Sequence, residues 1–179
     1  MKKIKLFTFL ILTLKVVNPA FAQLSLTSPV QMNFGTIEFA DAGGQNDVFL
    51  GTNGNVTYTN NFSGSGLGTP AELQILDTLG VIVQIGCDKN LTISNGISTV
   101  QVDRIEYVVG VGNGAPFGAG NACRGTRKLD VLHILTGNLT QDTILVGGRI
   151  RTSSSSVASG QWSSAQPGGS PVSFRVLVQ

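Results

Sequence analysis

The chain ends on the stretch PVSFRVLVQ, residues 171–179, which carries the clearest strand pattern in the sequence. Its apolar side chains occupy every second position, and this period is typical of a β-strand that buries one face. These apolar residues are Val172, Phe174, Val176 and Val178. No turn signal or polar tail follows them. We therefore predict that the chain finishes in a strand, which needs other strands beside it.

Short strand patterns of the same kind recur toward the N-terminus, separated by Gly, Asn and Asp turns. The alternation in VQMNFGTIEF, residues 30–39, changes phase at Gly35, which predicts a β-bulge or kink. Asn53-Gly54 lies between two short strand-like segments and predicts a hairpin. No apolar pattern of helical period is sustained after residue 22. The sequence therefore predicts an all-β fold, an antiparallel β-sandwich over residues 31–179.

Residues 1–22 have the layout of a secretory signal peptide. Lysines near the start precede an apolar run over residues 6–14, and small residues flank the end of the segment at Ala22. The alternative is a membrane anchor, but this run is shorter than the roughly 20 residues that a bilayer requires. We expect cleavage after Ala22, no membrane span in the mature chain, and export through a bacterial periplasm to the cell surface or the medium.

Removal of this leader changes the charge of the chain. The leader holds four of the 12 Lys and Arg residues, which leaves eight cationic residues against ten acidic ones, a net charge of −2. The mature chain therefore has no basic patch to favour nucleic acid as a partner. Charged residues make up only 12% of the chain, well under the roughly 25% of an average soluble domain. Such a surface suits a protein that packs against neighbours.

Both cysteines, Cys87 and Cys123, lie in the predicted mature chain. In an oxidising compartment, two cysteines most simply form one disulfide, and we predict this bond. Two free thiols or a metal site are the alternatives. A metal site is disfavoured because no His or acidic neighbours at ligand spacing complete the four ligands of structural zinc.

The sequence offers no recognisable catalytic or cofactor motif. His133 is the single histidine and lies within an apparent strand, and no G-x-S-x-G motif supplies a nucleophile. We expect a packed or edge histidine, no enzyme and no cofactor; a hydrolase would require a serine to meet His133 in space. The loop DAGGQND could hold calcium through Asp41 and Asp47, although a plain turn is the favoured interpretation.

Several short motifs follow one another in an order that resembles a known group of proteins. They are MNFGTIEF (32–39), TPAELQI (69–75), GVIVQI (80–85), LTISNG (91–96), VQVD (100–103), SGQW (159–162) and PVSFRVLV (171–178). In this order the chain resembles a family of small bacterial secreted domains of unknown function. That family is similar in outline to spore coat protein U and to the archaic chaperone–usher pilin domains. The resemblance covers residues 30–179.

The resemblance implies an immunoglobulin-like sandwich that lacks its last strand. In chaperone–usher pilins, an N-terminal extension of a neighbouring subunit fills the gap by strand addition, and a periplasmic chaperone covers the open edge before assembly. The implied function is therefore that of a secreted structural subunit in a bacterial surface filament, a fimbria or pilus. Its implied partners are copies of itself, a periplasmic chaperone and an outer-membrane usher.

In this chain, the resemblance implies a donor strand at residues 23–30 and an acceptor edge at the C-terminal strand. The donor residues on one face are Leu24, Leu26 and Val30, and the acceptor-edge residues are Val172, Phe174, Val176 and Val178. The alternative is a self-contained secreted β-sandwich, a binding or coat module that does not polymerise. Residues 23–29 would then be a frayed terminus.

Overall fold

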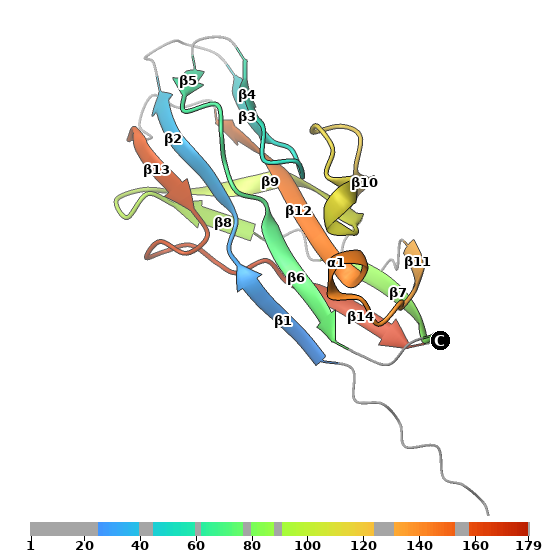
Figure 1. Ribbon diagram of the computed structural model, residues 1–179. Helices are drawn as coiled ribbons and strands as arrows, with labels where there is room; N and C mark the ends of the chain where they lie inside the picture. Colours follow the sequence, from blue (N-terminus) through green and yellow to red (C-terminus); the bar gives the residue numbers. More distant parts are fainter. Residues whose placement is uncertain are drawn as a thin grey trace, which may run out of the picture.

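The computed structural model describes residues 25–39, 45–59, 62–76, 80–87, 91–123, 131–152 and 158–178. The predicted signal peptide and the first donor residue, Leu24, lie outside these described residues. Nearly all of the regular secondary structure in the described chain is β-strand; the exceptions are a 3-10 turn, η1 (Val111–Asn113), and one short helix, α1 (Leu139–Asp142) (Figure 1). No helix in the described ranges is long and apolar enough to cross a membrane.

Eleven of the described strands form one large sheet. Its main path runs through β1 (Ser25–Val30), β6 (Ala71–Leu76), β12 (Thr143–Thr152), β9 (Thr99–Val109), β8 (Leu91–Ser94), β13 (Gly160–Ser163), β2 (Asn33–Phe39) and β5 (Phe62–Gly64). Off this path, β3 (Asn46–Leu50) pairs with β12 and with β4 (Val56–Tyr58), and β10 (Asn121–Ala122) pairs with β9.

Three further strands form a small sheet in the order β11 (Val131–Ile134), β7 (Ile82–Cys87) and β14 (Phe174–Val178). Every strand pairing in the described chain, in both sheets, is antiparallel. The predicted all-β antiparallel sandwich is therefore confirmed, and the C-terminal stretch forms its last strand.

The large sheet curves around a shared core. β1 and β2 follow each other in the chain but lie near opposite ends of the strand order, so the sheet must bend to bring both ends together. Its largest fully buried side chains include Trp162, Tyr107 and Phe34. The small sheet packs on the same core, because the rings of Tyr107 and Phe174 meet edge to face with centroids 5.5 Å apart.

Two local predictions are also confirmed. The pairing of β2 with β13 shifts register where Gly35 faces Trp162, and Gly35 has a φ of 74°, which a residue with a Cβ rarely adopts. β3 and β4 form the predicted hairpin around Asn53-Gly54, where Gly54 has a φ of 84°. The glycines thus set where strands bend and reverse.

Candidate assembly surface

The C-terminal strand lies at one edge of the small sheet. β14 pairs with β7 from Phe174 opposite Cys87 to Val178 opposite Val83, and no other described strand pairs with it. Val172, just before the strand, is 5% exposed, and Phe174 and Val176 pack partly buried against the core. The predicted acceptor residues therefore line a sheet edge whose second side has no described strand beside it.

The ladder between β2 and β13 ends before the chain reaches β14. β2 and β13 pair as far as Asn33 and Ser163, and the Ser164 N–H still donates to the Met32 carbonyl at 2.9 Å. Beyond this point the two chain segments separate. Toward the N-terminus, β1 crosses to β6 in the large sheet, whereas toward the C-terminus the chain joins β7 in the small sheet.

The chain from β13 to β14 runs in one direction, first beside β8 and then beside β7. The Ser170 N–H donates to the Thr92 carbonyl at 2.8 Å, and Phe174 pairs with Cys87. Because β13 is also antiparallel to β8, β13 and β14 run the same way. β2 is antiparallel to β13. An N-terminal segment that ran straight on into β2, in the same direction, would therefore be antiparallel to β14. An added N-terminal strand would thus have the direction needed to extend the small sheet.

The predicted donor segment pairs within its own chain. Ser25 to Thr27 lie opposite Leu76 to Gln74 of β6, and Val30 lies opposite Glu72 after a register irregularity that includes Pro29. Leu26 faces Ile75 in this register. In the single chain, residues 25–30 are therefore an edge strand of the large sheet. Donation to another subunit requires β1 to leave β6.

The two cysteines join the two sheets. Cys87 at the end of β7 and Cys123 next to β10 form a disulfide with their Cα atoms 5.7 Å apart, as predicted. Cys87 is fully buried, and the Cys123 N–H donates to the Ile105 carbonyl of β9 at 2.8 Å. The bond therefore ties the small sheet, which contains the predicted acceptor edge, to the centre of the large sheet.

The outer face of the small sheet carries exposed aliphatic side chains. Leu132 is 65% exposed, Ile134 60%, Ile82 44% and Leu177 40%; we call these four residues the aliphatic face. Ile134 lies opposite Ile82, and Leu132 and Leu177 lie on either side of Gln84. Ile134 and Ile82 are therefore close neighbours on β11 and β7, whereas the polar Gln84 of β7 separates Leu132 from Leu177.

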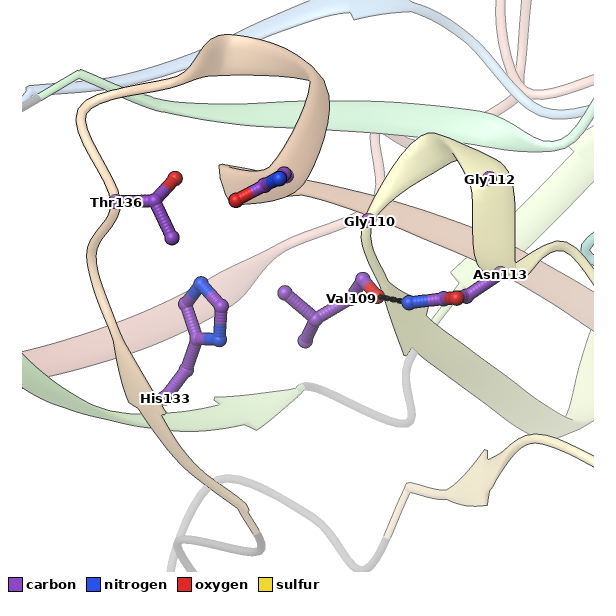
Figure 2. Close-up of a pocket in the computed structure, with 7 residues that line it drawn as sticks. Val109, Gly110, Gly112, Asn113, His133 and Thr136 are labelled. Atoms are coloured by element: carbon purple, nitrogen blue, oxygen red, sulfur yellow. Dashed lines mark hydrogen bonds between the residues drawn. The ribbon is translucent and has the colours of Figure 1, made fainter.

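His133 points away from that face, toward a cavity of about 480 Å³ between β11 and the end of β9 (Figure 2). Its Nε2–H donates to the Asp142 carboxylate at 2.8 Å, since a carboxylate can only accept. The Thr136 N–H and hydroxyl donate to the same carboxylate at 3.0 and 3.1 Å. Asp142 is 2% exposed, so this buried group holds the loop after β11 in place.

The electrostatics of Asp142 follow from these contacts. Burial acts to raise the pKa of its carboxyl, but the hydrogen bonds from His133 and Thr136 outweigh burial and leave the pKa below its ordinary value of 3.8. The other residues that line the cavity are Val109, Gly110, Gly112, Asn113 and Gln141. No serine or cysteine is among the described lining residues, and the Thr136 hydroxyl is engaged by Asp142.

Charged residues gather on the outer face of the large sheet. Arg149 on β12 binds Asp103 on β9 through two hydrogen bonds, and its neighbour Arg151 binds Asp47 on β3 at 2.7 and 2.8 Å. Arg149 also lies 4.0 Å from Asp47, so the four side chains form a continuous ladder of ion pairs, which we call the charge ladder. The hydrogen bonds from Arg151 lower the pKa of Asp47.

Asp47, one of the two carboxylates considered as calcium ligands, is part of this charge ladder. Both carboxylate oxygens of Asp47 accept hydrogen bonds from Arg151, and Asp41 lies outside the described residues. Among the described residues, no group of three or more His, Cys, Asp or Glu side chains could hold a metal ion.

Comparisons of the chain with protein-family models, with curated proteins and with solved structures found no match.

Sequence reasoning missed two features of this surface. It gave His133 no partner, because Asp142 follows nine positions later beyond a turn and carries no motif. It also treated KLDVLHIL, residues 128–135, as one more apolar strand, and the alternation does not say that Leu132 and Ile134 stay exposed. The only available signal was that apolar residues occupy both faces of that strand.

Proposed function

We propose that the chain is a secreted structural subunit of a bacterial surface filament and that it assembles by strand complementation. The open edge of β14 carries this proposal. It is a strand without a second partner among the described strands, and it packs on the core through Phe174 and Val176. An exposed strand edge of this kind is a template for another strand.

The donor in this proposal is the segment 23–30 of a neighbouring copy. The segment has alternating apolar residues, and its direction along the line of β2 matches an antiparallel addition to β14. Head-to-tail contacts that do not close into a ring generate filaments. A periplasmic chaperone would cover the same edge before assembly, and an outer-membrane usher would deliver the subunit to the surface.

The energetics explain why assembly would need such helpers. To donate, β1 must give up its pairing with β6, which includes Leu26 opposite Ile75. Burial of an aliphatic side chain contributes about 1.5–3 kcal/mol. The exchange of β6 for β14 of a neighbour therefore gives up one strand pairing and gains another. The monomer in which β1 pairs with its own β6 would be the form that exists before assembly.

The pairing of β1 with β6 also favours a second candidate function. A domain whose N-terminal segment closes on its own sheet is complete as a secreted binding or coat module. In that case, β14 is simply the last strand of a monomer. The two functions differ in one measurable property, which is whether the mature protein polymerises through the β14 edge.

Proline substitutions at neighbouring positions test that edge. Along an antiparallel strand, successive N–H groups point to opposite sides, so one of the Val176 and Leu177 N–H groups faces β7 and the other faces the open edge. Proline removes an N–H. We expect one of Val176→Pro and Leu177→Pro to unfold the domain. The other should give a folded monomer that forms no filaments by electron microscopy, while the wild-type protein does.

A synthetic peptide of residues 23–30 provides the complementary test. It should bind the mature wild-type protein and cap its polymerisation, whereas a peptide with aspartate at the positions of Leu24 and Leu26 should not. A wild-type protein that stays monomeric, with and without the peptide, would assign the chain to the self-contained module.

A further inference from the structure

We propose that the cavity beside His133 binds a neutral, polyhydroxylated ligand, that is, an uncharged sugar. The cavity has a volume of about 480 Å³ and lies between β11 and the end of β9. This volume is within the range of about 300–1,000 Å³ that is typical of small-molecule sites. Strand addition uses the edge of β14 instead, so the inference does not depend on the proposed filament function.

A buried carboxylate fixes the hydrogen-bonding state of the imidazole ring that faces this cavity. The His133 Nε2–H donates to Asp142, which is 2% exposed and also accepts hydrogen bonds from the N–H and hydroxyl of Thr136. The Asp142 carboxylate therefore holds the proton of a neutral ring on Nε2 and leaves Nδ1 as an acceptor.

The second ring nitrogen of His133 is available to a ligand. Figure 2 shows Nε2 on the side of the ring toward Thr136 and Nδ1 on the side toward Val109, which also lines the cavity. No group of the described chain donates a hydrogen bond to Nδ1. The ring therefore presents a pre-oriented acceptor to whatever occupies the cavity.

The rest of the lining selects a ligand that is polar and uncharged. None of the described lining residues is Asp, Glu, Lys or Arg, so an ionic ligand would lose water without gaining a counter-charge. None is aromatic, so a flat heterocycle has no ring on which to stack. The lining instead offers two carboxamides, from Asn113 and Gln141, and one aliphatic side chain, Val109.

Hydroxyl groups match the hydrogen-bonding capacity that this lining leaves open. The Asn113 Nδ2–H donates to the Val109 carbonyl at 2.7 Å, which leaves its Oδ1 and second N–H for a ligand. Gln141 is exposed, and its carboxamide has no partner in the described chain. A carboxamide donates and accepts, whereas Nδ1 only accepts. Because a hydroxyl also donates and accepts, neighbouring hydroxyls of one sugar can satisfy His133, Asn113 and Gln141 together.

The small number of contacts sets the expected strength of binding. A few hydrogen bonds and one aliphatic contact give a dissociation constant on the order of 1 mM. Where many copies of the chain lie together, such weak sites would add on a surface that carries many sugars.

Nitrogen NMR of the oxidised mature protein, isotopically labelled at its single histidine, tests the proposal in two steps. The free protein should show a ring with its proton on Nε2 and a bare Nδ1. Titration with glucose, galactose, mannose and N-acetylglucosamine should then shift the Nδ1 resonance saturably for at least one sugar. Glucuronate and glucosamine, which carry a charge on a similar ring, should bind at least tenfold more weakly.

Two matched substitutions locate the binding in the cavity. Gln141→Ala should weaken binding of that sugar about fivefold, whereas Gln161→Ala, at an exposed position of β13, should leave it unchanged. Neither side chain has a partner in the described chain, so both variants should fold, and circular dichroism checks this. His133→Gln keeps a donor for Asp142 but removes Nδ1, and it should weaken binding at least tenfold by calorimetry.

The proposal would be overturned by a ring that carries its proton on Nδ1. It would also be overturned if none of the four sugars gave a saturable shift up to about 50 mM, or if the charged sugars bound as tightly as the neutral ones. Equal affinities of the wild-type protein and Gln141→Ala would place the binding outside this cavity and overturn the proposal as well. These measurements use the monomer, so their outcome is independent of filament formation.

Discussion

The large sheet presents a ladder of ion pairs on its outer face, whereas the small sheet presents aliphatic side chains. In a chain with only 12% charged residues, Asp47, Asp103, Arg149 and Arg151 gather on one sheet face. The small sheet carries the exposed aliphatic face, and both its edge strands, β11 and β14, pair only with β7 among the described strands. The ladder of ion pairs therefore lies on the large sheet, and the aliphatic face lies on the small sheet.

The two sheets also depend on different interactions for their position. The large sheet has long central strands, and β9 and β12 pair over most of their lengths. The small sheet has three short strands, which are held to the large sheet by core packing around Phe174 and by the disulfide. Perturbations of the attachment should therefore affect the small sheet first.

Loss of the disulfide should have the largest effect on this attachment. The bond closes a loop with a sequence separation of 36, for which chain entropy gives a stabilisation of about 4 kcal/mol. We expect the Cys87→Ser/Cys123→Ser variant to lose about this free energy of unfolding in urea titrations. Wild-type protein in a reducing agent should match it. An unchanged midpoint would show that packing alone holds the small sheet.

Removal of the Asp142 carboxylate should have the next largest effect. Asp142→Asn replaces a buried acceptor of hydrogen bonds from His133 and Thr136, which should cost about 2 kcal/mol at neutral pH. The pKa of Asp142 is lowered in the folded state, so its contribution is present above the ordinary value and is lost as the pH falls through the lowered pKa. The difference between wild type and variant should therefore shrink in strong acid.

Thermal unfolding of both proteins at pH 7 and at pH 2 measures this dependence. Asp103→Asn is the matched control, because Asp103 is a more exposed carboxylate whose partner Arg149 lies at the surface. A difference between wild type and Asp142→Asn that is independent of pH would contradict the assignment.

The charge ladder should give the smallest effect. Arg149→Met removes two hydrogen bonds to Asp103 and the contact with Asp47, and partly exposed ion pairs contribute about 1 kcal/mol or less. The loss should be measurable in low salt and should nearly vanish in about 1 M salt, where screening acts over roughly 3 Å. A large loss of unfolding free energy that persists in high salt would contradict this account. It would show that the Arg149 side chain stabilises the fold mainly through packing contacts.

Much of the fold follows from local sequence signals. Gly35 and Asn53-Gly54 predicted the bulge and the hairpin, because their backbone conformations are costly for other residues. The alternation of residues 172–178 predicted a strand with one face on the core. The pairing of Cys87 with Cys123 followed because the chain holds no third cysteine. The bulge, the hairpin and the strand are each encoded within a few residues. The disulfide could be predicted because two cysteines allow only one pairing.

The choice of partner strand was not predictable in the same way. Alternation in residues 23–30 says which side chains share a face, but it does not say whether β6 or a β14 edge lies beside them. Likewise, the residues near His133 in the sequence do not predict its hydrogen bond with Asp142, because that contact depends on the path of the loop after β11. Long-range pairing is decided by the packing of the whole sandwich, and short motifs do not record it.

Hydrogen exchange at β14 tests most directly whether that edge receives a strand from another copy. In the monomeric mature protein, β14 amides that bond to β7 should be protected, and the alternate amides at the open edge should exchange rapidly. In assembled protein, the account predicts that those alternate amides also become protected, while amides of β1 lose their pairing with β6 and gain the new one. Assembled protein in which the open-edge amides of β14 exchange as fast as in the monomer would contradict it.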